Sequence, residues 1–297
     1  MDINLIVQQN EQSIFKKFLL LALFLAPVAY ISLILSVAIH EIIGHGLAAI
    51  ALGGKFYGFE LELDGMGWAS CNLPSGASTT DNIIHLAAGV TATTVTGLVL
   101  LAVAYRIRKR LGIRLSLLIL SFMCLMEGIP YVFWNSYNPV PPGDIGRIIA
   151  LWLSAGFSGE MGIRIFLLAA SGIMFCISIF FLCALLLQGI EEAILAGKRF
   201  SPQARFWVLL LFLVIPGVAA WFLFDWNQIA PGVGLLPCIV GAASIVISAI
   251  ILYWFSLKPR SDVLGINIKW YHLLISYGFL ILLVAFIYVS RMRRYAD

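Results

Sequence analysis

Two histidines and a glutamate stand close together in an apolar segment near the start of the chain. They are His40, Glu41 and His45, within the sequence His-Glu-Ile-Ile-Gly-His. Charged and imidazole side chains are costly within a membrane-spanning helix, so their presence there usually has a functional reason. Imidazoles bind zinc, one position on the metal stays open for water, and a carboxylate takes the proton of that water. These residue types predict a zinc hydrolase with two histidine ligands and Glu41 as the base.

The spacing of the histidines differs from the usual zinc motif, in which they lie four residues apart. Four residues of a regular helix leave them about 40° apart around its axis, whereas five residues leave them about 140° apart. A π-bulge restores a common face, and such bulges are frequent at functional sites. Gly44 would ease this distortion. The alternative is a polar helix end at which the histidines meet backbone groups or water.

A third protein ligand is needed, and Asp144 is the best candidate. Prolines and a glycine end the preceding apolar segment and place Asp144 at the start of the next one, as a helix N-terminal residue. Its carboxylate can then face the first site. An ordinary helix cap is the alternative interpretation of Asp144. An interfacial anchor is the simpler interpretation of Arg147.

Other polar residues are weaker candidates for a function. Glu127 is a carboxylate within an apolar segment, and it can be a reserve ligand, a proton carrier or a partner for a buried hydroxyl. Asn135 and Asn138 can hydrogen-bond an extended substrate backbone, although turn formation explains them equally well. His85 opens a small-residue segment and is interpreted as structural. His272 stands beside two aromatic residues and is interpreted as part of an aromatic belt.

The elements that must position these residues are mostly membrane-spanning helices. The chain has 297 residues, of which 61% are hydrophobic and only 11% charged, whereas about 25% are charged in soluble domains. About 20 apolar residues cross a membrane as a helix. About seven such segments occur, over residues 18–53, 82–105, 115–134, 163–188, 206–224, 233–255 and 271–290. The expected fold class is therefore an all-α polytopic membrane protein.

The first apolar segment and the loop after it have features of their own. The segment is too long for one perpendicular crossing, so we expect it to tilt, to kink at Pro27 or to project from the bilayer. A removable signal peptide is not expected, because no small-residue cleavage site follows a short apolar core. The loop, residues 54–81, alternates polar and apolar residues and then reaches glycines. This pattern predicts a short β-hairpin at the membrane face, with an irregular loop as an equal alternative.

No composition change separates a soluble domain from the membrane part, and no internal repeat is evident. We expect a single membrane domain over residues 1–297, with a metalloprotease-like core over 1–160 and additional transmembrane helices over 161–297. The five cysteines are scattered, so neither a disulfide framework nor a cysteine zinc site is predicted. The net charge of +4 is spread over short loops and does not indicate a nucleic-acid partner.

On these motifs the chain resembles the site-2 protease family of intramembrane zinc metalloproteases. The resemblance covers roughly the first half of the chain. It rests on the His-Glu helix leading into residues 46–49 and 53–54, on the small-residue segment 87–89, and on the Asn-Pro-x-Pro-Pro-x-Asp-x-Gly region at residues 138–146. Two details differ from the family: the His-Glu-x-x-Gly-His spacing, and a glycine before and an isoleucine after the aspartate, where the family commonly has leucine and glycine.

The resemblance implies that His40 and His45 are the zinc histidines, Glu41 the general base and Asp144 the aspartate ligand. It also implies an endopeptidase of the cell membrane that contains Zn²⁺ and cleaves membrane proteins or membrane-anchored peptides in or near their transmembrane segments. The alternatives are a non-catalytic pseudoprotease that binds transmembrane helices and a transporter. A transporter is expected to have paired broken helices in two related halves, and the sequence has no such symmetry.

Overall fold

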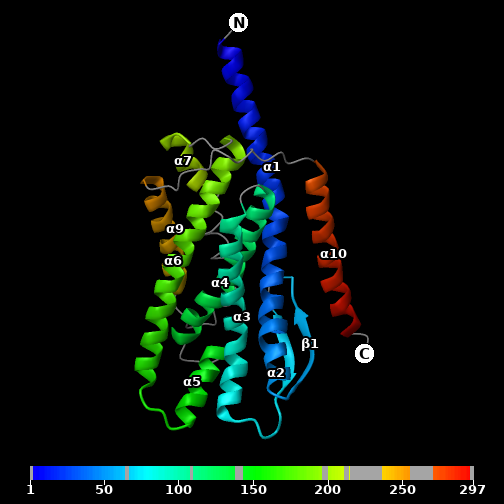
Figure 1. Ribbon diagram of the computed structural model, residues 1–297, viewed down its shortest axis with the longest axis vertical. Coiled ribbons are helices and arrows are strands. Elements are labelled where there is room, and N and C mark those ends of the chain that lie inside the picture. Colours follow the sequence, from blue (N-terminus) through cyan, green and yellow to red (C-terminus); the bar gives the residue numbers. More distant parts are fainter. Residues whose placement is uncertain are drawn as a thin grey trace.

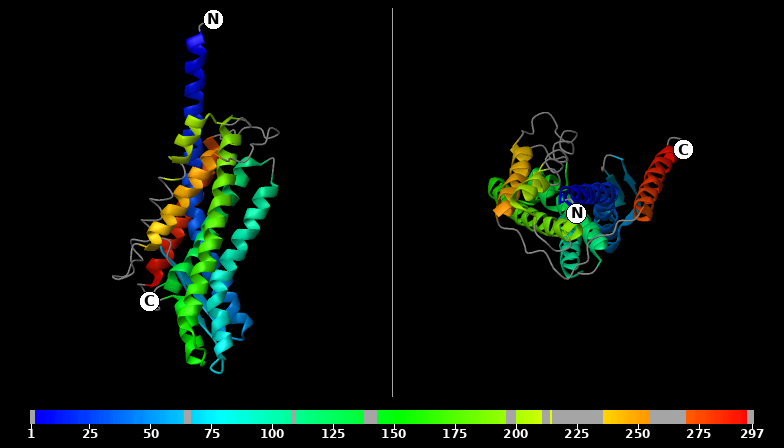
Figure 2. Two further views of the ribbon diagram at one scale, coloured as in Figure 1. Left: turned by 90° about the vertical axis from the view of Figure 1, so that its left-hand side faces the viewer. Right: turned by 90° about the horizontal axis from the view of Figure 1, so that it is seen from above.

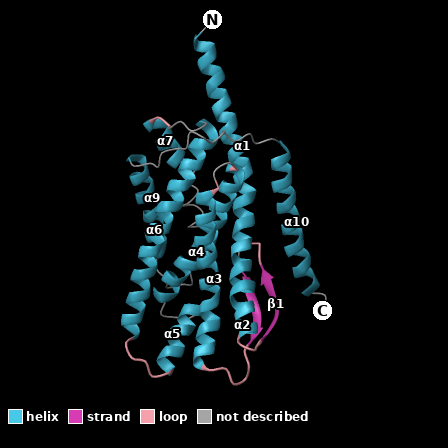
Figure 3. Cartoon of the chain, viewed as in Figure 1, coloured by secondary structure: helices cyan, strands magenta, loops and turns pink. Residues whose placement is uncertain are grey.

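The computed structural model shows a mostly helical protein whose long helices run side by side, with one small sheet near one end of the bundle (Figure 1, Figure 3). The residues that the structure describes are 3–63, 67–107, 110–137, 143–195, 200–210, 214, 236–254 and 270–294.

The first helical run is continuous but changes its winding at the predicted metal ligands. Helix α1 spans Ile3–Ala38 and includes Pro27, the π-helix η1 spans Ile39–Gly46, and α2 spans Leu47–Ala51. In Figure 1 the N-terminal end of α1 extends beyond the other helices. The predicted π-bulge is therefore confirmed, and it is longer than a single bulge.

The predicted hairpin is also present. Strands β1 (Lys55–Leu61) and β2 (Gly67–Asn72) pair antiparallel, with an irregularity between Phe56 and Gly58. The sheet packs on η1 and on the end of α1. This packing is close because small residues of η1 leave room for larger side chains of the sheet. A Cβ atom added at Gly46 would lie 3.1 Å from the ring of Phe56. The turn residues between the two strands lie outside the described residues.

Helices α3 (Thr79–Arg106) and α4 (Leu111–Tyr137) form an antiparallel pair, and α3 packs against η1. Helix α3 begins with a capping box, in which the Ser78 hydroxyl accepts the Asp81 N–H and the Asp81 carboxylate accepts the Ser78 N–H. The two helices approach closely because Gly128 packs against the hydroxyl groups of Thr93 and Thr94. Small residues at helix contacts allow such close packing in membrane proteins.

The remaining helices pack on this pair, on α1 or on one another. Helix α5 spans Asp144–Ser154, α6 Glu160–Leu195, α7 Pro202–Leu209, α9 Leu236–Trp254 and α10 Trp270–Arg294. The largest hydrophobic cluster combines residues of α1, α3, α4, α6, α7 and α9, so the core runs through both halves of the chain. Seen from above, α9 and α10 lie on opposite sides of α1 (Figure 2).

Five helices in the described part of the chain are long and apolar enough to cross a membrane. They are Lys16–Ala51, Thr79–Arg106, Leu111–Phe133, Glu160–Leu195 and Trp270–Tyr288. The expected crossing at residues 206–224 lies largely outside the described residues, and the one at 233–255 corresponds in part to α9. Membrane helices are thus confirmed, whereas the number of about seven stays a prediction.

Candidate metal centre

The π-helix turns His40 and His45 toward one another. Their ring centroids lie 5.0 Å apart, and both side chains are buried. Each π turn contains more residues than an α turn, so a spacing of five returns to nearly the same face. The π winding therefore places both histidines on one face of the helix, as a four-residue spacing would in a regular α-helix.

A close contact between η1 and α3 forms the wall of this centre. A Cβ atom added at Gly44 would overlap the backbone of Gly89, so two glycines meet where the helices cross. A Cβ atom added at Gly89 would overlap Nε2 of His40 and would lie 2.7 Å from Nε2 of His45. Both Nε2 atoms therefore converge on the backbone at Gly89. Gly44 thus serves helix packing as well as local distortion.

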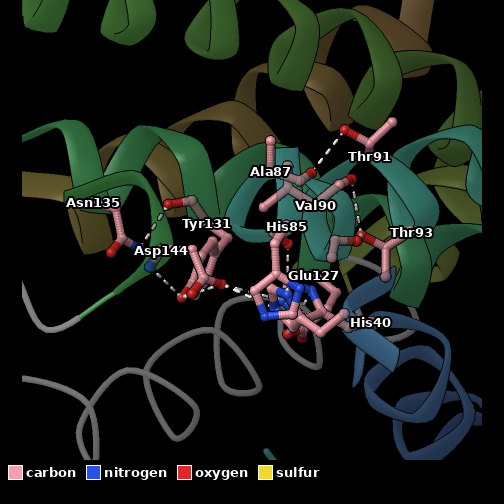
Figure 4. Close-up of polar contacts among 12 residues, drawn as sticks. His40, His85, Ala87, Val90, Thr91, Thr93, Glu127, Tyr131, Asn135 and Asp144 are labelled. Atoms are coloured by element: carbon pink, nitrogen blue, oxygen red, sulfur yellow. Dashed lines mark hydrogen bonds and ion pairs between the residues drawn. The ribbon is translucent and has the colours of Figure 1, made fainter. Parts of the chain in front are cut away.

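Asp144 completes the group from the start of α5. Its Oδ2 atom lies 3.2 Å from Nε2 of His45 and 3.6 Å from Nε2 of His40 (Figure 4). Two ligands about 2.0 Å from a tetrahedral zinc ion are separated by about 3.3 Å. The two measured distances match this spacing, and two imidazoles with one carboxylate form a donor set that suits zinc. The residues therefore fit the metal that the sequence motifs imply.

The negative charge of Asp144 is well supported. Burial alone would raise the pKa of this carboxyl group, but hydrogen bonds and charge interactions with His40 and His45 outweigh burial and hold the pKa well below its usual range. The position at the first turn of a helix adds to this effect, because the helix dipole favours an anion there. The carboxylate is thus anionic in the form that binds a cation.

Glu41 lies beside the two histidines. One potential ligand atom from each of His40, Glu41 and His45 lies within 4.8 Å of the other two. The backbone of Ala69, in β2, hydrogen-bonds to the Glu41 carboxylate and ties it to the hairpin. The Glu41 side chain is largely buried, which restricts its movement. A water molecule near the two histidines would therefore lie within reach of the Glu41 carboxylate.

Two residues that were not proposed as ligands also lie in the centre. They are His85, which was interpreted as structural from the sequence, and Tyr131, which was not singled out from it. The carbonyl of His85 accepts a hydrogen bond of 2.9 Å from Nδ1 of His45, and the two rings are 5.2 Å apart. The Tyr131 hydroxyl accepts the backbone N–H of Asp144 at 3.2 Å and lies 3.4 Å from its Oδ2 atom. Only the position of Tyr131, one turn after Glu127 on the same helix, would have indicated it from the sequence.

Of the weaker candidates, Asn135 lies against Gly143, the residue directly before Asp144. Its amide donates to the carbonyl of Tyr131 at 2.9 Å, and its side-chain oxygen occupies the space that a Cβ at Gly143 would need. A substrate-binding role for Asn135 stays a prediction, and Asn138 lies outside the described residues. Arg147 is exposed.

His272 contacts the ring of Tyr271 at the start of α10. The cysteines described by the structure, Cys71, Cys124, Cys176 and Cys183, are free thiols.

Part of the chain matches a known protein family. Residues 17–134 match the family model described as Peptidase M50B-like. The matched range contains His40, Glu41 and His45 and ends before Asp144. The match covers less than half of the chain and is consistent with the site-2 protease family. No curated protein and no solved structure matches the chain significantly.

Proposed function

We propose that this M50B-like membrane protein is a zinc-dependent intramembrane endopeptidase that cleaves peptide bonds in or near transmembrane segments. The observation that carries the proposal is the convergence of Nε2 of His40, Nε2 of His45 and Oδ2 of Asp144, with Glu41 beside them. Helices of membrane-spanning length hold this group, so its substrate is a membrane protein or a membrane-anchored peptide in the cell membrane.

His40, His45 and Asp144 would hold the metal. Zinc at such a site supplies Lewis acidity toward a water molecule and toward the carbonyl group of the substrate. The Glu41 carboxylate takes the proton of that water as its oxygen bonds to the carbonyl carbon. Glu41 then gives the proton to the leaving nitrogen as the C–N bond breaks. The products are a carboxylic acid and an amine.

The hairpin offers a way to hold the substrate in extended form. The N–H of Ala69 bonds to Glu41 and so points away from β1, which means that the outer edge of β2 faces the base. An extended peptide can add a strand to such an edge through backbone hydrogen bonds. The scissile bond would then lie near Glu41. This binding mode supports cleavage of segments whose helix has opened.

Glu41→Gln is the direct test of the chemistry. The amide cannot take a proton from water but keeps nearly the same size, so cleavage falls about 10²–10⁴-fold while zinc stays bound. Purified protein is reconstituted in liposomes with a panel of tagged single-span membrane proteins, and cleavage is followed by gel shift. Glu160→Gln is the matched control, because this carboxylate lies at the exposed start of α6.

Three results are informative. Cleavage by wild type and by Glu160→Gln, with none by Glu41→Gln, supports the proposal. Undiminished cleavage by Glu41→Gln contradicts the mechanism. Zinc binding by wild type without cleavage of any panel member favours a pseudoprotease that binds transmembrane helices.

A further inference from the structure

The two zinc-binding imidazoles have their second ring nitrogen on the side away from the shared wall. Both Nε2 atoms face Gly89 and Asp144, so each Nδ1 atom points elsewhere. A histidine that binds a metal through Nε2 carries its proton on Nδ1. This proton usually goes to a carboxylate or a backbone carbonyl, which fixes the orientation of the ring.

His45 has such a partner in the structure. Its Nδ1–H donates to the carbonyl of His85 at 2.9 Å. That carbonyl belongs to the first part of α3 and is held by the helix backbone. The orientation of the His45 ring is therefore set by α3.

His40 faces a different helix. Its Nδ1 atom has no hydrogen-bond partner among the described residues, and the Glu127 Oε1 atom lies 3.9 Å away (Figure 4). A movement of about 1 Å by either side chain would make a hydrogen bond. Glu127 is largely buried, and a buried carboxylate needs a compensating partner. The Nδ1–H group of His40 is a donor within this reach of the Glu127 carboxylate.

Glu127 faces the wrong side of His40 to be a further ligand of the same ion. Nδ1 and Nε2 lie on different edges of the ring, and Nε2 is the atom that approaches Asp144 and His45. The His40 ring thus has a metal edge, which carries Nε2, and a supporting edge, which carries Nδ1. Glu127 belongs to the supporting edge.

Tyr131 stands one helical turn after Glu127 on α4 and contacts the third ligand. Its hydroxyl accepts the backbone N–H of Asp144 at 3.2 Å and lies 3.4 Å from Oδ2. Residues four apart on a helix lie on one face. One face of α4 therefore meets both His40 and Asp144, which come from different parts of the chain.

We propose that α4 is the positioning helix of the metal centre, with Glu127 orienting the His40 ligand and Tyr131 orienting the Asp144 ligand. The inference rests on the proposed zinc site but assigns roles that the zinc ligands alone do not. Gly128, between the two residues, allows the close contact of α4 with Thr93 and Thr94 on α3. The two positioning residues are thus held against the same helix that orients His45.

The test measures zinc affinity by competition with a chromophoric chelator for the full-length protein in detergent. Glu127→Leu removes the acceptor, and we expect zinc affinity to fall about 10–100-fold. Glu127→Gln keeps an acceptor oxygen and should lose less. Tyr131→Phe should weaken zinc binding about tenfold. Ser121→Ala is the control, because it removes another buried hydrogen bond of α4, from Ser121 to the Gly97 carbonyl, and should leave the affinity unchanged.

Two further measurements separate positioning from ligation and from folding. The absorption spectrum of Co²⁺-substituted Glu127→Leu should keep the intensity of a tetrahedral site, whereas a change of coordination number would make Glu127 a ligand and overturn the inference. The unfolding temperature of the zinc-free variants should stay near that of wild type, while the added stability on zinc binding becomes smaller. A matching drop in the zinc-free protein would indicate a structural role and overturn the inference.

The outcomes also separate this inference from the proposed function. If wild type and Glu127→Leu bind zinc equally well, the positioning role is wrong while the zinc peptidase proposal stands. If wild type itself binds no zinc, both are wrong.

Discussion

Gly89 has no chemistry of its own, yet the imidazoles of His40 and His45 both lie against its backbone. Any side chain at this position would occupy the space of the two Nε2 atoms. The shape of the centre therefore depends on the absence of a side chain at Gly89 as much as on the two histidines and Asp144.

Gly89→Ala should consequently abolish stoichiometric zinc binding, because the new methyl group forces the imidazoles away from Asp144. Gly278→Ala is the matched control: it lies within α10, and its Cβ would meet nothing within 4 Å. Elemental analysis of both purified variants measures the effect. Zinc content near wild type in Gly89→Ala would contradict the convergence of the ligands on this backbone.

The residues proposed as ligands could be singled out from the sequence, but their surroundings could not. His40, Glu41 and His45 are polar residues in an apolar segment. Because placing them there costs free energy, they are candidates for a function. Asp144 was recognisable because prolines and a glycine mark the start of its helix. Gly89 and Tyr131 act through contacts between distant segments. Gly89 lies in the small-residue segment 87–89 and Tyr131 lies one turn after Glu127, but nothing else in the local pattern distinguishes them from other small or aromatic residues of membrane helices.

The contribution of the elements is clearest in η1 and the hairpin. The five-residue spacing of the histidines required a change of winding, so the π-helix followed from geometry and chemistry together. The hairpin followed from alternation and glycines, which also allowed an irregular loop. Its orientation, with the edge of β2 toward Glu41, could not be predicted, because it depends on how Phe56 packs on Gly46.

The open edge of β2 gives a prediction at this scale. Cys71 follows Ala69 by two residues, so its N–H should point to the same edge. Cys71→Pro removes that donor and should raise KM with little change in zinc content. Thr79→Pro is the control, since proline is tolerated at the first position of a helix. Unchanged kinetics of Cys71→Pro in the liposome assay would argue against strand addition.

At the scale of the whole molecule, a second polar cluster lies far from the metal centre. Arg114 at the start of α4 is fully buried and pairs with Glu192 near the end of α6, while its other nitrogen donates to Gln188 at 2.9 Å. Nearby, Arg205 of α7 lies 3.4 Å from Glu191. These pairs join α4, α6 and α7 at the end of the bundle away from α2 and α5 (Figure 1).

Arg114→Met should therefore lower the free energy of unfolding by about 3–5 kcal/mol, because it removes one partner of a buried ion pair and leaves the buried Glu192 carboxylate without that partner. Zinc affinity of the folded protein should not change. Unfolding in mixed micelles, followed by circular dichroism, measures the stability. The double variant Arg114→Met with Glu192→Leu should recover much of the loss. Failure of that recovery would show that the pair is not the cause.

The hydropathy of the chain predicted a membrane protein, and the described part contains five helices that can cross a membrane. Hydropathy cannot say which apolar segments span the bilayer and which pack inside the protein, since both are equally apolar. The continuous core shared by both halves explains why no boundary was visible in the sequence.

The most direct test of the central claim is the zinc content of purified wild type and of His45→Ala, measured by elemental analysis after removal of loosely bound metal. We predict about one zinc ion per chain in wild type, and its loss in His45→Ala, because two remaining protein ligands hold zinc poorly. Wild-type protein without zinc, or His45→Ala with undiminished zinc, would contradict zinc binding by His40, His45 and Asp144.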